Sequence, residues 1–244
     1  MDPLNFDGKT VLVVGGSSGI GNAIAQSFRA CGAEVHVWGT RATAADYAGD
    51  DGSDLTGLHY AQMDVSDFAA IEAYRPPFDR LDVLVLSQGL VLYKRAEFEV
   101  AGFRKVLDVN LTSLMACAGK FHPLLRAAKG SVIVISSTAA FHATRGNPAY
   151  NASKAGAAGL TRTLADAWAG DGIRVNGIAP GMVPTKMTKV TTDNPKRLEA
   201  MLRDVPMGRV GTTGEIAGVA LFLASPLSSY VLGHTIPVDG GLLL

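Results

Sequence analysis

The sequence is poor in three things, and each scarcity argues against a class of protein. Only two cysteines occur among 244 residues, Cys31 and Cys117, and neither has metal-ligand spacing, so we expect no disulfide and no metal site. Lys and Arg together number 22, as do Asp and Glu, so no positive excess is available for nucleic acid or a membrane surface. No apolar run approaches the roughly 18 residues that span a bilayer. The N-terminal stretch MDPLNFDGKT lacks a signal-peptide pattern, which favours a cytoplasmic protein.

Hydrophobic residues make up 48% of the chain, enough for a substantial core. Short β-branched runs alternate with longer segments of helical periodicity, and several runs are apolar throughout, as in strands covered on both faces. This alternation predicts a doubly wound α/β fold with a parallel sheet. We expect a single domain over residues 1–244, with residues 182–206 as a substrate lid. The expected strands are 10–14, 35–38, 83–86, 131–135 and 174–178, and the expected helices are 19–31, 66–74, 99–127, 150–170 and 213–224.

The first expected strand runs into the glycine-rich stretch GGSSGIG. Gly15 permits a tight turn, Gly19 permits close approach of a pyrophosphate, and Gly21 permits close packing of helix on strand. The helix that begins here presents unpaired N–H groups at its positive end. A purely structural turn remains the alternative, because three glycines alone are weak evidence. The position between strand and helix favours a phosphate cradle.

Tyr150 and Lys154 are four residues apart where a helical pattern begins, so they share one helix face. A phenol has an unperturbed pKa near 10, and a nearby ammonium group favours its ionised form. The pair is therefore a candidate acid/base, although this spacing also occurs by chance. Ser136 and Ser137 follow an expected strand at the carboxyl edge, where open α/β sheets bind ligands. Asn110 lies in a helical pattern, where its amide can hold a water or accept a local hydrogen bond.

The ordered motifs GGSSGIG, DVN, SS, YNASK and PGMVPT resemble those of the short-chain dehydrogenase/reductase family, over essentially the whole chain. The resemblance implies a single-domain Rossmann-type fold with a seven-stranded parallel sheet and helices on both faces, usually assembled as a homotetramer. It implies an acid/base role for Tyr150, a Lys154 that lowers the pKa of Tyr150 and binds ribose, a carbonyl-polarising Ser137 and a water-holding Asn110. Where the family usually has N-N-A-G, this chain has residues 86–89, LSQG, which removes two asparagines that support the sheet.

The resemblance also implies a set of cofactor contacts. Asp64 matches the residue that bonds the adenine amino group, and Val65 packs beside that ring. Residues 180–185 match the segment that flanks the nicotinamide carboxamide. The full set of expected cofactor-binding residues is Gly15, Ser17, Ser18, Gly19, Ile20, Gly21, Gly39, Thr40, Arg41, Asp64, Val65, Gln88, Gly89, Tyr150, Lys154, Pro180, Gly181, Val183 and Thr185.

The end of the second expected strand bears on the choice of cofactor. NAD-binding folds place an acid there to accept from both ribose hydroxyls, and that position is Gly39 in this chain. A nearby cation favours NADP through charge-assisted hydrogen bonds to the 2′-phosphate. Arg41 follows two residues later, with Thr40 between. We therefore expect NADP(H), with NAD(H) as the alternative.

The substrate is expected to be a small-molecule ketone or secondary alcohol, in keeping with the resemblance. The helix that carries Tyr150 ends in residues 169–172, AGDG, which argues against a carrier-protein substrate because reductases of that kind present basic residues there. A largely apolar pocket suits a small cyclic or aryl ketone. Its expected contacts are Ser137, His142, Asn147, Tyr150, Met182 and Met187, with Gln88, Leu90, Leu92 and Thr144 nearby.

Two other functions remain open at this point. One is an NAD-dependent dehydrogenase of a diol, sugar or cyclic alcohol. The other is a dinucleotide-binding regulator without catalysis, which is disfavoured because Tyr150 and Lys154 are both present. The resemblance implies that helices 99–127 and 150–170 form the subunit contacts, and the apolar tail 242–244 is a further candidate for burial between subunits.

Overall fold

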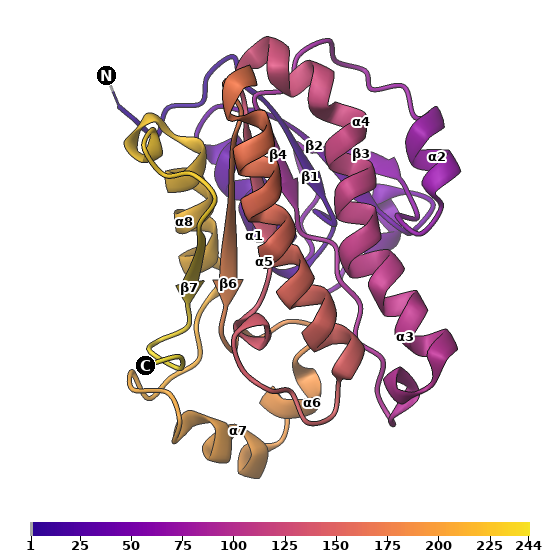
Figure 1. The fold of residues 1–244 in the computed structure, drawn as a ribbon, viewed down its shortest axis with the longest axis vertical. Coiled ribbons are helices and arrows are strands. Elements are labelled where there is room, and N and C mark those ends of the chain that lie inside the picture. The colour runs from indigo at the N-terminus through magenta and orange to yellow at the C-terminus, as the bar shows by residue number, and fades with distance from the viewer. Residues whose placement is uncertain (1) are drawn as a thin grey trace.

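A computed structural model describes residues 2–244, and its elements alternate along the chain as the sequence predicts (Figure 1). The strands are β1 (Thr10–Val14), β2 (Glu34–Gly39), β3 (His59–Gln62), β4 (Val83–Leu86), β5 (Ser131–Ile135), β6 (Arg174–Pro180) and β7 (Thr235–Val238). The helices are α1 (Gly19–Ala30), α2 (Phe68–Ala73), α3 (Val100–Leu107), α4 (Ser113–Ala128), α5 (Pro148–Trp168), α6 (Lys189–Thr192), α7 (Pro195–Leu202) and α8 (Thr213–Ala224).

The seven strands form one sheet in the order β3-β2-β1-β4-β5-β6-β7, and every neighbouring pair is parallel. The Rossmann-type, seven-stranded parallel fold that the resemblance implies is confirmed. Because all strands run in one direction, the loops that follow them meet at one edge of the sheet. The strand order reverses between β1 and β4, and this edge is where such folds bind ligands.

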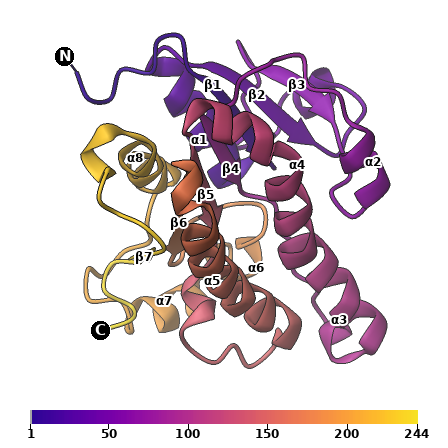
Figure 2. The same ribbon diagram turned by 45° about the horizontal axis from the view of Figure 1, so that its top comes forward.

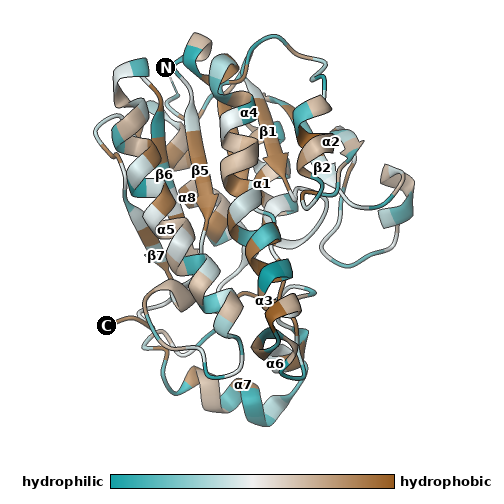
Figure 3. Cartoon of the chain, turned by 45° about the vertical axis from the view of Figure 1, so that its right-hand side comes forward, coloured by the Kyte–Doolittle hydropathy of each residue, from teal (hydrophilic) through white to brown (hydrophobic). Residues whose placement is uncertain are grey.

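Helices cover both faces of the sheet because alternate strand residues are buried on opposite sides. Leu12 and Val14 pack on the face covered by α4 and α5, while Val11 and Val13 pack on the face covered by α1 and α8. After a polar first residue, the central strands β1 and β5 are hydrophobic, as their mostly brown colour in Figure 3 shows. Figures 1 and 2 show the short helices α6 and α7, which belong to the expected lid, projecting beyond one end of the sheet.

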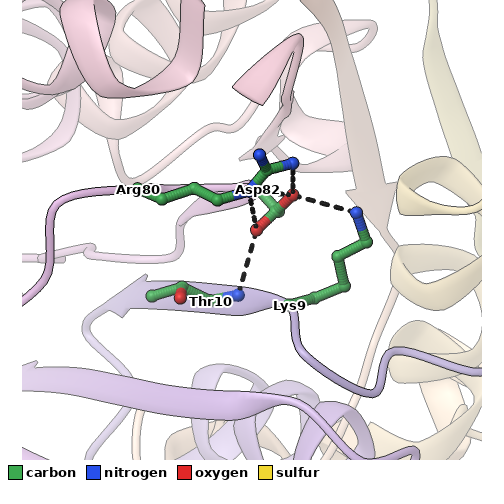
Figure 4. Close-up of polar contacts among 4 residues, drawn as sticks. All are labelled: Lys9, Thr10, Arg80 and Asp82. Carbon is green, nitrogen blue, oxygen red and sulfur yellow. Dashed lines mark hydrogen bonds and ion pairs between the residues drawn. The ribbon is translucent and has the colours of Figure 1, made fainter. Parts of the chain in front are cut away.

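A buried carboxylate joins β1 and β4 at the amino-terminal edge of the sheet (Figure 4). Asp82 is only 7% exposed and accepts hydrogen bonds from the Thr10 backbone at 3.1 Å, the Lys9 ammonium at 3.1 Å and the Arg80 guanidinium at 2.7 Å. Burial alone would raise the pKa of Asp82, but these hydrogen bonds outweigh it and hold the pKa below its ordinary value. The site therefore fixes the start of both strands with one ionised group.

The structure differs from the expected elements in three places. Strand β3 (HYAQ) and strand β7 were not among the runs read from the sequence. The expected helix 99–127 is interrupted by a π-helical turn, Asp108–Thr112, which contains Asn110.

Cys31 and Cys117 are free thiols. Across residues 2–244, no helix is both long and apolar enough to cross a membrane.

Candidate active site

A cavity of about 530 Å³ opens at the carboxyl edge of the sheet. Its walls come from the segments that follow β1, β2, β3, β4, β5 and β6, together with the start of α5 and the lid. Of the residues expected to contact cofactor or substrate, those that line the cavity are Gly15, Ser17, Ser18, Gly19, Ile20, Gly21, Gly39, Thr40, Val65, Gln88, Gly89, Ser137, Tyr150, Lys154, Pro180, Gly181, Val183, Thr185 and Met187. The structure thus brings residues from the whole length of the chain to one site.

The glycine turn forms a cradle that no larger residues could make. A Cβ on Gly21 would lie 2.2 Å from the backbone oxygen of Gly15, and Gly19 adopts a φ of +58°. Both positions therefore need glycine, for close packing and for left-handed backbone respectively. Ser18 caps α1 but makes no side-chain cap hydrogen bond. The arrangement suits an anion such as a pyrophosphate, which the positive end of α1 would attract.

Tyr150 and Ser137 face each other across the inner wall of the cavity. Tyr150 lies in the first turn of α5, and Ser137 follows β5, where its hydroxyl accepts a hydrogen bond from the Ala139 backbone at 3.1 Å. Burial raises the pKa of Tyr150, and only a hydrogen bond with Ser137 opposes the rise. The phenol is therefore protonated at neutral pH. Two hydroxyl groups in this position can both donate to one carbonyl oxygen.

Lys154 is one helical turn beyond Tyr150 and its side chain is buried in the cavity wall. Its ammonium donates to the backbone oxygen of Ile135 at 2.8 Å and lies 5.7 Å from the centre of the Tyr150 ring. Burial lowers the pKa of Lys154 to about 8. The resemblance implies that Lys154 lowers the pKa of Tyr150, but in this structure the effect of burial on both groups is the stronger one.

Glu97 supports the first turn of α5, and the sequence reading did not identify it. Its carboxylate is fully buried and accepts hydrogen bonds from the Tyr150 backbone at 2.9 Å, the Leu92 backbone at 3.0 Å and the Asn147 amide at 3.2 Å. A carboxylate is stabilised at a helix N-terminus by the unpaired N–H groups and the helix dipole. Glu97 therefore holds the backbone of Tyr150 in place.

The side chain of Asn110 connects two segments of the chain. Its amide clamps the backbone of Leu90, accepting from the N–H at 2.7 Å and donating to the carbonyl at 2.9 Å. It also donates to Ser153 at 3.1 Å, and Ser153 donates to the backbone oxygen of Tyr150. Both polar atoms of the Asn110 side chain thus have protein partners, and they connect the segment after β4 to α5.

Gln88 replaces part of the sheet support that the missing asparagines would give. Its amide nitrogen donates to Ser113 at 2.9 Å, and Ser113 donates to the backbone oxygen of Val109 in the π-helical turn. This chain of bonds connects the end of β4 to the start of α4. The side-chain oxygen of Gln88 is buried and has no partner among residues 2–244, so one acceptor at the cavity wall stays unused.

The end of β2 is shaped by Tyr47, which the sequence reading also missed. Its hydroxyl accepts from the backbone N–H groups of Thr40 at 3.0 Å and Arg41 at 3.2 Å. A Cβ on Gly39 would lie 2.7 Å from this hydroxyl and 2.7 Å from the Ser17 side chain. An acidic residue at Gly39 therefore has no room in this structure, because both neighbours would have to move.

Arg41 lies just outside the cavity, with its guanidinium over the Tyr47 ring at 4.5 Å and 2.7 Å from the Asp50 carboxylate. Lys186 of the lid contacts the same carboxylate at 2.6 Å. Asp50 therefore forms ion pairs with two side chains: Arg41, near the end of the cavity where the ribose is expected, and Lys186, from the expected lid. The pKa of Asp50 is lowered, chiefly by its hydrogen bond with Lys186.

Several expected contacts lie outside the cavity. Asp64 is exposed and accepts from Ser66, and His142 is exposed and contacts the backbone of Ala143. Asn147 is at the N-cap of α5, and its side-chain amide donates hydrogen bonds to the Leu92 backbone oxygen and the Glu97 carboxylate. Met182 is partly buried and does not line the cavity, whereas Met187 does.

Comparison with known proteins identifies the family. A family model described as enoyl-(acyl carrier protein) reductase matches residues 14–243. The 3-oxoacyl-[acyl-carrier-protein] reductase FabG of Chlamydia muridarum is 39% identical, with 96% of this chain and 97% of the relative covered. The chain belongs to the short-chain dehydrogenase/reductase family.

Solved structures of other short-chain dehydrogenases/reductases share the fold closely. The Pseudomonas aeruginosa RhlG/NADP active-site complex has a TM-score of 0.90 at 36% identity, covering 100% of both chains. A gluconate 5-dehydrogenase from Burkholderia cenocepacia, in complex with NADP and tartrate, has a TM-score of 0.89 at 29% identity. It covers 99% of this chain and 97% of that one. The chain is therefore an oxidoreductase by family, and the FabG relative and the gluconate 5-dehydrogenase are named for different substrates.

Proposed function

We propose that this protein is an NADP(H)-dependent oxidoreductase that interconverts a small ketone and a secondary alcohol, with Tyr150 as the acid/base. The observation that carries the proposal is the meeting of Tyr150, Ser137 and Lys154 at one wall of the cavity, next to the glycine cradle. An acid, a second hydroxyl and a cation around one point form the group needed to polarise and protonate a carbonyl oxygen.

The proposed mechanism uses each group according to its environment. Ser137 and Tyr150 donate hydrogen bonds to the carbonyl oxygen and orient the substrate. In the reduction direction Tyr150 gives its proton to that oxygen, because burial keeps the phenol protonated at neutral pH. The bound nicotinamide supplies the hydride. Lys154, whose ammonium is held by the backbone of Ile135, stabilises the tyrosinate that remains and binds the ribose hydroxyls.

The cofactor preference rests on the end of β2. Gly39 cannot accept from ribose hydroxyls, and an acid there is excluded by Ser17 and Tyr47. Arg41 is the cation nearest this position along the chain, and relatives of known structure carry NADP. We expect Arg41→Ala to weaken NADPH binding roughly ten-fold or more while leaving NADH binding unchanged. An unchanged preference for NADPH would remove Arg41 from the proposal.

The substrate is proposed to be a free ketone rather than an acyl group on a carrier protein. Leu90, Val91, Val109 and Met187 give the cavity a largely apolar wall. Beyond the end of α5, Arg126 and His122 are both engaged by Asp171, at 3.3 and 2.9 Å. The Arg126 charge is therefore already paired with a carboxylate at the place where a basic docking surface for an acidic carrier is expected.

A substrate screen tests this proposal. Wild-type protein is incubated with NADPH or NADH and a panel of cyclic ketones, aryl ketones, free β-keto esters, keto-gluconates and a 3-oxoacyl carrier protein, and the loss of reduced cofactor is followed. We expect turnover with NADPH and a free ketone. Turnover confined to the carrier-bound substrate would overturn the substrate class. Faster turnover with NADH would favour the NAD-linked alternative, for a diol, sugar or cyclic alcohol.

We also propose a homotetramer built on α4 and α5. Met115 is 44% exposed on α4, and Ala152 and Ala155 are exposed on α5, where small side chains let two helices approach closely. Leu244 at the apolar tail is fully exposed in the single chain. Light scattering after gel filtration is expected to give four times the chain mass of 25.4 kDa, and a monomer at micromolar concentration would contradict it.

A further inference from the structure

A cluster of possible metal ligands lies on β2 and β3, away from the cavity. Glu34 and His36 alternate on β2 and so face the same side of the sheet, and His59 at the start of β3 is the register partner of His36. One ligand atom from each of the three lies within 4.8 Å of the other two. The parallel pairing of β2 with β3 therefore gathers three donors that are 25 residues apart at most in the sequence.

The distances within the cluster are close to those that a metal ion needs. A tetrahedral Zn²⁺ with bonds of about 2.0–2.1 Å places its ligand atoms about 3.3 Å from one another. Here the Glu34 carboxylate oxygen is 3.0 Å from Nε2 of His36 and 3.9 Å from Nε2 of His59. The two values bracket the required separation. The His36 and His59 rings are stacked at an interplanar angle of 23°, so the exposed His59 ring must turn to direct its nitrogen at the same ion.

The surroundings give the cluster one fixed ligand and two accessible ones. His36 is 5% exposed and packs between the Phe78 ring at 4.7 Å and the His59 ring, also at 4.7 Å. The side chains of Glu34 and His59 are 54% and 61% exposed, which leaves a path for an ion and room for water. Within the described chain, the ion pairs of Glu34 involve only the two histidines, so no lysine or arginine competes for its carboxylate.

We propose that Glu34, His36 and His59 bind one divalent transition-metal ion, with Zn²⁺ as the best match and water as the fourth ligand. Two imidazoles and one carboxylate suit zinc, and an open fourth position is common in such three-ligand sites. The ion would join the short edge strand β3 to β2. Binding to the folded chain alone would stabilise it. The proposal is independent of the oxidoreductase function.

Calorimetric titration of chelator-treated protein with Zn²⁺ tests the site directly. We expect about one ion per chain with a micromolar dissociation constant, together with a rise in melting temperature. His59→Ala and Glu34→Gln are expected to lower the affinity at least about ten-fold and to remove the rise in melting temperature. Both positions are exposed, so these variants should fold; their melting temperatures without zinc check this.

The matched control is His234→Ala, an exposed histidine just before β7, at the opposite edge of the sheet. It should bind zinc as the wild type does. With Co²⁺ as a probe, the wild type and His234→Ala should show the visible absorption of a four-coordinate ion, and His59→Ala should lose it. Equal zinc binding by the wild type and His59→Ala, or no binding by the wild type at about 100 μM zinc, would overturn the proposal.

Discussion

The carboxylate of Asp50 lies 2.6 Å from the ammonium of Lys186, and this contact joins the loop after β2 to the lid. The same carboxylate holds Arg41 at 2.7 Å. Asp50 therefore pairs with both Arg41, the cation proposed to bind the 2′-phosphate, and Lys186. The 2′-phosphate of a bound NADP would compete with Asp50 for these two cations, so we expect Asp50 to weaken NADP binding.

The Asp50→Asn variant tests this competition between Asp50 and the 2′-phosphate. Removing the charge frees Arg41 and Lys186, so NADPH binding should tighten by roughly two- to five-fold, as expected for a screened surface ion pair. NADH, which has no 2′-phosphate, should bind as before. Fluorescence titration with each cofactor measures both values. The control is Asp51→Asn, at the exposed neighbouring position. Tighter NADH binding, or equal effects of the two variants on NADPH binding, would contradict this competition.

Gly39→Ala tests the crowding at the end of β2. The added methyl group would lie 2.7 Å from Ser17 and from the Tyr47 hydroxyl, so overpacking should cost about 1–3 kcal/mol of unfolding free energy. Urea unfolding measures the change. Gly49 is not a suitable control position, because its backbone has a φ of +79°. Gly146→Ala serves instead, since nothing lies within 4 Å of its added Cβ. Equal stability of Gly39→Ala and the wild type would show that an acid could be accommodated at this position.

Lys154 should impose a pH dependence on stability. Its pKa falls from 10.5 in the unfolded chain to about 8 in the folded one, so between these values the unfolded state binds more protons. Stability therefore rises with pH in this window, and the cost of the buried ammonium is fully present below pH 8. Relative to Lys154→Met, the cofactor-free wild type should gain about 2 kcal/mol between pH 6.5 and 9.5. Parallel curves for the two proteins would show that the Lys154 pKa is not depressed.

Asp82 should also make stability rise with pH, but in the acid range. Its pKa is held below the ordinary value, so its stabilisation is fully present above the unfolded pKa of about 4 and disappears as pH falls through the folded pKa. Asp82→Asn should lower the unfolding free energy by about 1–3 kcal/mol at pH 7. The difference from the wild type should shrink below pH 4. A difference that stays constant down to pH 2 would contradict an ionised Asp82 in the folded state.

The sequence predicted the main strands, and it singled out Tyr150 and Lys154, which line one cavity, because these signals are local. The strand TVLVV is apolar after its first residue, and Tyr150 and Lys154 are one helical turn apart. Strand β3 was missed because HYAQ has neither alternation nor a continuous apolar run, and is only partly buried. It is a strand because β2 offers it a free edge, which is a property of the sheet and not of the four residues.

The supporting residues were missed for a related reason. Glu97 reaches Tyr150 across 53 residues of sequence, and no local pattern marks it. Tyr47 fills the turn after β2 through hydrogen bonds to its backbone, so its role depends on how that turn folds. Arg41 stays a predicted phosphate contact, and its ion pair with Asp50 was not foreseen because it depends on how the loop after β2 folds.

Turnover by Tyr150→Phe tests the central claim most directly. Phenylalanine keeps the ring and removes only the hydroxyl that is proposed to transfer the proton to and from the substrate oxygen. With the best ketone from the screen, kcat should fall by about 10²- to 10⁴-fold, while the dissociation constant for NADPH stays within roughly three-fold of the wild type. A Tyr150→Phe variant that binds NADPH normally and keeps the wild-type kcat would contradict the account.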